Sequence, residues 1–98
     1  MTTHTSRAEV ATDAPARYAK QLVAHLGRKL TFTTDGATST TNLDDTTASI
    51  TVGDNVLIMV AAGPSEEGVA RAAHVLGSHL ERFGQRNELA VTWTTTAE

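Results

Sequence analysis

Residues 64–93, PSEEGVARAAHVLGSHLERFGQRNELAVTW, decide the fold. In the first part, apolar residues recur at intervals of three and four, a spacing that stacks them on one face of a helix. They are Val69, Ala72, Ala73, Leu76, Leu80 and Phe83. Pro64 suits a first helical turn, and Gly84 suits a helix end. Residues 89–93 then alternate between large apolar and small or polar side chains, which indicates a strand that turns Trp93 into the core.

The composition is that of a small globular domain. The chain has 98 residues, 40% of them hydrophobic and 19% charged, which suffices for one domain with a modest core. Its net charge of −3 argues against a nucleic-acid partner, which would require a basic surface. Cysteine is absent, so disulfides and thiolate chemistry are excluded. Because no apolar run reaches the roughly 20 residues of a membrane span and no signal-peptide region is visible, a cytoplasmic protein is expected.

A mobile lead-in over residues 1–5 and a single domain over residues 6–95 are expected. The elements predicted before residue 64 are a strand at 6–12, a helix from Pro15 to about Lys29, and strands at 30–34, 37–42, 47–52 and 56–60. Asp35-Gly36 predicts a hairpin, and the polar strand 37–42 fits only an exposed edge. Two helices with one apolar side each would cover the same sheet face. The predicted fold class is α+β, a two-layer sandwich with a mostly antiparallel sheet: a ferredoxin-like variant with an extra hairpin.

The strand at residues 56–60, Val-Leu-Ile-Met-Val, is apolar on both sides, because successive strand residues point to opposite faces. One side can meet the helices. The other has two interpretations. Either neighbouring threonine methyl groups screen the outer face of a central strand, or that face binds a partner, most simply in a homodimer. A homodimer would bury Leu57 and Met59, or else Val56 and Ile58.

Two histidines are candidates for a binding site. His25 and His79 each fall at the edge of the apolar face of a predicted helix, so they could face one another across an inter-helix groove. The candidate ligand-binding residues are Tyr18, Gln21, His25, Lys29, His79, Arg82 and Arg86. Three interpretations stay open: histidines that only cover the core, a site for an anion or other ligand, and metal or haem ligation. Two histidines without a third ligand at a fixed spacing are only a weak indication of a metal site.

Two ordered blocks of residues carry a family resemblance. The first is Arg17-Tyr18, Gln21-Leu22, His25 and Lys29; the second is His79-Leu80-Glu81-Arg82-Phe83, Arg86, Glu88-Leu89, Val91 and Trp93. Together they resemble the DUF2218 family of bacterial domains over nearly the whole chain, with a departure at residues 35–49. The resemblance implies no assigned activity. It does imply an association with siderophore-interacting flavoproteins, and hence with iron handling.

Three functions remain open at this point. The preferred one is a small accessory or binding domain, homodimeric, with an anionic small molecule or a flavoprotein as partner and no cofactor. The second is a small enzyme in which His25 or His79 acts as general base and Arg82 stabilises negative charge. The third is a haem or metal carrier that uses the same histidines. Since the chain has no nucleophile elbow, dinucleotide motif or phosphate loop, no residue is assigned a catalytic role.

Overall fold

Eight elements follow one another in the part of the chain that the computed structural model describes, residues 3–83 and 91–97. They are β1 (His4–Ala11), α1 (Pro15–Leu26), β2 (Thr33–Asp35), β3 (Thr38–Leu43), β4 (Thr46–Gly53), β5 (Val56–Gly63), α2 (Glu66–Phe83) and β6 (Thr94–Ala97). Ser65 defines the start of α2, because its hydroxyl accepts a hydrogen bond from the Gly68 N–H at 3.1 Å.

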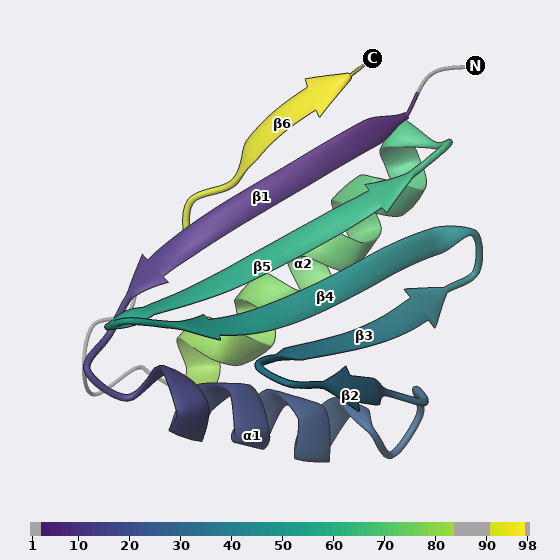
Figure 1. The fold of residues 1–98 in the computed structure, drawn as a ribbon. Helices are drawn as coiled ribbons and strands as arrows, with labels where there is room; N and C mark the ends of the chain where they lie inside the picture. The colour runs from purple at the N-terminus through teal and green to yellow at the C-terminus, as the bar shows by residue number, and fades with distance from the viewer. Residues whose placement is uncertain (1–2, 84–90, 98) are drawn as a thin grey trace.

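The six strands form one antiparallel sheet in the order β2-β3-β4-β5-β1-β6. Tight turns join β2 to β3, β3 to β4 and β4 to β5, and each holds a residue with positive φ: Gly36, Asp44 and Asn55. Both helices pack against one face of this sheet, and Figure 1 shows α2 running behind it. The predicted α+β architecture, with two helices on one face of an antiparallel sheet, is confirmed.

The core fills the space between this sheet face and the helices. The helices contribute apolar residues at the predicted spacing, among them Leu22, Leu26, Leu76 and Leu80, all buried. Ile50 of β4 and the inward residues of β5 meet them from the sheet. Burying each such side chain stabilises the fold by roughly 1.5–3 kcal/mol, so the helical stripes hold the two layers together.

Strand β5 turns Leu57 and Met59 toward the helices. Both side chains are 0% exposed, and both lie opposite buried residues of β1. The prediction that Leu57 and Met59 could contact a partner in a homodimer is therefore wrong. Val56 and Ile58 point to the opposite face and are half-buried. The sequence pattern could not separate these two pairs, because every residue of the strand is apolar.

Several predicted elements differ from the observed ones. His4 and Thr5 belong to β1, where they pair with both β5 and β6, rather than to a lead-in. Helix α1 ends at Leu26, three residues before the predicted end. The strand predicted at 37–42 is not the sheet edge, because β2 lies outside it.

The last strand also differs, since it begins at Thr94, directly after Trp93. The half-buried side chains of Val91 and Trp93 pack against the core instead of joining the sheet ladder. The first residues of the strand predicted at 89–93 lie outside the described residues. At Val91 and Trp93 the apolar alternation thus reflects packing against the core and not strand pairing.

Candidate functional site

The two candidate histidines meet where the end of α1 lies beside the second half of α2. The ring centroids of His25 and His79 are 4.9 Å apart, with 45° between the ring planes. Each histidine borders its helix's apolar stripe, so helix packing alone brings the rings together. The His25 side chain is exposed and that of His79 is half-buried. The juxtaposition expected from helix geometry is therefore present.

A backbone contact orients the imidazole of His79. Its Nδ1 lies 2.7 Å from the carbonyl oxygen of Val75, one helical turn earlier. A carbonyl oxygen can only accept a hydrogen bond, so Nδ1 must carry the proton. In the neutral ring, Nε2 is then the nitrogen with the lone pair, and in the charged ring Nε2 becomes a second donor. His79 can thus act toward a ligand through Nε2 while Nδ1 holds the ring in place.

A pocket of about 490 Å³ opens beside the two rings. Its apolar lining comes from Leu26, Leu30, Leu43 and Val75, and its polar lining from His25, Arg28, Lys29 and His79. No carboxylate is among the described residues that line it. The pocket therefore combines an apolar wall with a concentration of positive charge, although the chain as a whole carries −3.

The early end of α1 explains how Arg28 and Lys29 reach this pocket. The backbone N–H of Gly27 donates a hydrogen bond to the Val23 carbonyl. The backbone N–H groups of Lys29 and Leu30 then both donate to the Leu26 carbonyl. The chain is turning there rather than continuing as a straight helix. Both basic residues line the pocket. Arg28 was not among the predicted site residues.

Three of the other predicted ligand-binding residues are not part of the pocket lining. Tyr18 is buried in the core, where only 4% of its surface is exposed. Gln21 and Arg82 are exposed but do not line the pocket. Arg86 lies outside the described residues. Of the seven candidates, the structure brings together His25, Lys29 and His79.

A second pocket, of about 480 Å³, lies between α2 and the C-terminal segment, where Trp93 and Val91 meet the helix. Its polar lining includes Glu66, His74 and Glu81, and the Glu81 carboxylate accepts the Val91 N–H at 3.2 Å. That bond shows the carboxylate holding the C-terminal segment in place.

Neither a metal cluster nor a membrane span is found in the described part of the chain. No group of three or more His, Asp or Glu side chains there could hold a metal ion. Over the same residues, neither helix is long and apolar enough to cross a membrane. An ion bound at His25 and His79 would therefore need ligands beyond those of the described residues.

Comparisons with known proteins identify a family. The NMR structure of PA4090 from Pseudomonas aeruginosa matches with a TM-score of 0.74 and 23% identity over 96% of each chain, which shows a shared fold. The de novo designed protein Foldit4 matches with a TM-score of 0.48 and 10% identity, over 97% of this chain and 94% of its own. No curated protein gives a significant match. The family model described as "Uncharacterized protein conserved in bacteria (DUF2218)" matches residues 7–94. Because that match covers most of the sequence, the chain belongs to the DUF2218 family.

Proposed function

We propose that this protein is a small accessory domain that binds an anionic small molecule in the pocket between α1 and α2. The observation that carries the proposal is the charge of the lining. Arg28 and Lys29 are both cationic side chains, and no carboxylate is among the described residues that line the pocket. An anion is the ligand that gains from this arrangement.

The shape of the pocket indicates what else the ligand carries. The guanidinium of Arg28 is suited to two parallel hydrogen bonds with a carboxylate or phosphate, and the ammonium of Lys29 adds a point charge. The leucines of the lining favour contact with an apolar or aromatic group. The ligand class is therefore an anionic group attached to an apolar body.

Benzoate is a suitable test compound, because it joins a carboxylate to an aromatic ring. It should raise the melting temperature of the parent protein, as any ligand of the native state does. The double variant Arg28→Ala/Lys29→Ala should lose this shift. Arg17→Ala is the matched control, since Arg17 is an exposed basic residue of α1 outside the pocket lining. Equal benzoate shifts in all three proteins would contradict the proposal.

His79→Asn tests the imidazole separately from the fold. The asparagine amide can replace Nδ1 as the donor to the Val75 carbonyl, but it leaves nothing at the position of Nε2. The variant should melt near the parent temperature without ligand and bind benzoate more weakly. Unchanged benzoate affinity would remove His79 from the site while leaving the basic pair in it.

One observation favours a second candidate function. In that function the histidines bind haem or a metal ion, or one of them acts as the base of a small enzyme. The bond from Nδ1 of His79 to a backbone carbonyl is the arrangement that orients metal-ligating histidines and general bases. Titration with Zn²⁺ and with haemin discriminates between the candidates. A new Soret band, or a Zn²⁺ complex that is lost in both His25→Ala and His79→Ala, would favour this alternative. The positive charge of Arg28 and Lys29 argues against a bound cation.

The association with iron–siderophore metabolism and a flavoprotein partner stays a proposal that rests on the family resemblance. An anionic iron chelate would belong to the ligand class proposed here.

The ferredoxin-like topology with an added hairpin also stays a proposal. It is supported by the strand order β6-β1-β5-β4, which places the first strand between the last strand and the one that precedes α2. Strands β2 and β3 would be the added part.

A further inference from the structure

The sheet face opposite the helices has no cover within the described part of the chain. In Figure 1, no helix crosses the face turned toward the viewer. Its centre is a stripe of half-buried apolar side chains on β5: Val56, Ile58, Val60 and Ala62. The stripe borders the serine and threonine side chains of β4 on one side and the outward residues of β1 on the other. The apolar stripe thus occupies the middle of the sheet, away from its edges.

Several hydroxyl groups beside the stripe already have partners in the same sheet. The Oγ1 atoms of Thr38 and Thr51 lie 2.9 Å apart, and the Thr47 hydroxyl donates to Oδ1 of Asn42 at 3.1 Å. Since these polar groups bond one another across neighbouring strands, a surface laid over them would not leave them unpaired. The threonine region can therefore be buried at little cost in lost hydrogen bonds.

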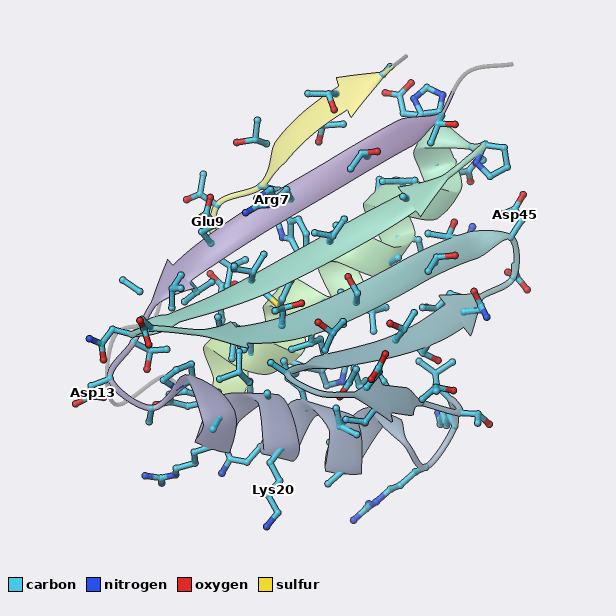
Figure 2. The ribbon with its side chains drawn as sticks, in the orientation of Figure 1. Arg7, Glu9, Asp13, Lys20 and Asp45 are labelled. Atoms are coloured by element: carbon cyan, nitrogen blue, oxygen red, sulfur yellow. The ribbon has the colours of Figure 1, made fainter. Side chains whose placement is uncertain are left out.

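One opposite-charge pair lies on the other side of the stripe. Nε of Arg7 is 3.5 Å from Oε2 of Glu9, and about half of each side chain is exposed, 53% and 59%. Figure 2 shows the two side chains next to each other on β1. They are the only Arg, Lys, Asp or Glu residues in the four strands β3, β4, β5 and β1. The central part of this face consequently carries one positive and one negative group and no net charge.

We propose that this face binds a second copy of the chain. The two-fold axis lies between the two sheets, perpendicular to the strands, at the level of Met59. Val60 and Ile58 lie one position to either side of that level. The axis therefore stacks Ile58 on the partner's Val60 and Val60 on the partner's Ile58. The two apolar stripes then cover each other as two sheets packed face to face.

The same axis pairs the charges between the two copies. Arg7 lies opposite Val60 in the strand register, and Glu9 lies opposite Ile58. Rotation about the axis consequently brings Arg7 to the partner's Glu9 and Glu9 to the partner's Arg7. A second copy is the one occupant whose charges must complement this pair, because it presents the same pair in reverse order. This self-complementarity is the argument for a homodimer over an unrelated partner.

The size of the face comes close to the minimum for such an interface. Strands β1, β4 and β5 have eight residues and β3 has six, so they extend about 26 Å and about 20 Å, and at about 4.8 Å per strand each copy would cover roughly 450 Å². The two copies together would bury about 900 Å², just below the lower limit for a stable specific protein–protein interface. A weak, reversible dimer is therefore expected.

Charge reversal tests the proposed axis. Arg7→Glu places glutamates against glutamates, and Glu9→Arg places arginines against arginines, so each variant should dimerise about tenfold more weakly or worse. The double variant Arg7→Glu/Glu9→Arg restores opposite charges across the axis and should regain the parent Kd. A mixture of the two single variants should form heterodimers in preference to either homodimer. Sedimentation equilibrium of the full chain and native mass spectrometry measure these outcomes.

Two further variants complete the test. Lys20→Glu is the control, because it changes the net charge as Arg7→Glu does but lies on α1, away from the proposed interface (Figure 2). The dimer Kd of this variant should equal that of the parent. Ile58→Lys should give a folded monomer, as judged by circular dichroism. A parent that is monomeric at high micromolar concentration would overturn the proposal. So would an Ile58→Lys variant that still dimerises, or a double charge reversal that dimerises no better than the single ones.

Discussion

Gly77 lies directly against the indole of Trp93: a Cβ built on Gly77 would stand 2.9 Å from Nε1 of Trp93 and 3.4 Å from a methyl group of Val91. Glycine in the middle of a helix costs about 1 kcal/mol relative to alanine. Here the missing side chain creates the space into which the tryptophan packs. The packing of Trp93 against α2 therefore outweighs the lower helix propensity of glycine at this position.

Gly77→Ala should therefore fail to stabilise the protein, although alanine is the better helix former. The new methyl group must displace Trp93, and overpacking of this kind costs typically 1–3 kcal/mol, which outweighs the gain in helix propensity. Thermal unfolding should show a melting temperature several degrees lower. A higher melting temperature would mean that the indole moves aside freely.

The matched control is the same substitution in a Trp93→Ala background. Trp93→Ala alone should cost about 1.5–3 kcal/mol, less than a fully buried tryptophan because the side chain is half-buried. With the indole removed, Gly77→Ala should stabilise by up to about 1 kcal/mol. The sign of its effect should thus reverse between the two backgrounds in a double-mutant cycle. Additive effects would rule out contact between the two positions.

Thr46→Val should stabilise the protein, whereas Thr41→Val should destabilise it. Both threonines are buried, at 0% and 2% exposed. The Thr41 hydroxyl donates to the Thr31 carbonyl at 2.7 Å, but the Thr46 hydroxyl has no hydrogen-bond partner in the structure. Replacing an unpaired buried hydroxyl by a methyl group removes a desolvation cost of about 1 kcal/mol or more, and losing the paired one should cost about 1 kcal/mol. Chemical denaturation of both variants measures the difference.

Lysine substitutions on β5 should distinguish the two faces of the sheet. Leu57→Lys buries a charge in the core beneath the helices, and the domain should lose most of its stability. Ile58→Lys places the charge on the uncovered face, where it stays hydrated, so the monomer should remain folded. Circular dichroism melts of the two proteins give the comparison. Equal loss of structure in both would contradict the assigned orientation of the strand.

The helices and their pairing could be predicted from the sequence, because apolar spacing fixes which side of a helix faces the sheet. That spacing also predicts the approach of His25 to His79, since both border a stripe that must pack. Arg28 could not be assigned to the pocket. Its position depends on where α1 stops, and Gly27 continues with ordinary right-handed dihedral angles (φ −62°, ψ −11°) in place of a left-handed cap.

Two other features depend on contacts that a one-dimensional pattern does not contain. The orientation of β5 is set by its pairing with β1, because residues 56–60 are apolar throughout and either face could be buried. The start of β6 at Thr94 follows from the space that Gly77 leaves for Trp93 on α2. In both cases the deciding partner lies far away in the sequence.

The position of β1 between β5 and β6 has a kinetic consequence. The register sets His4 opposite Ala97, so the first strand pairs with residues at the other end of the chain. Its second neighbour, β5, lies beyond the middle of the sequence. During synthesis, β1 must therefore wait without a strand partner until more than half of the chain has emerged. Contacts this distant in sequence slow folding, so refolding should be limited by the docking of the N-terminal strand, well after α2 has formed.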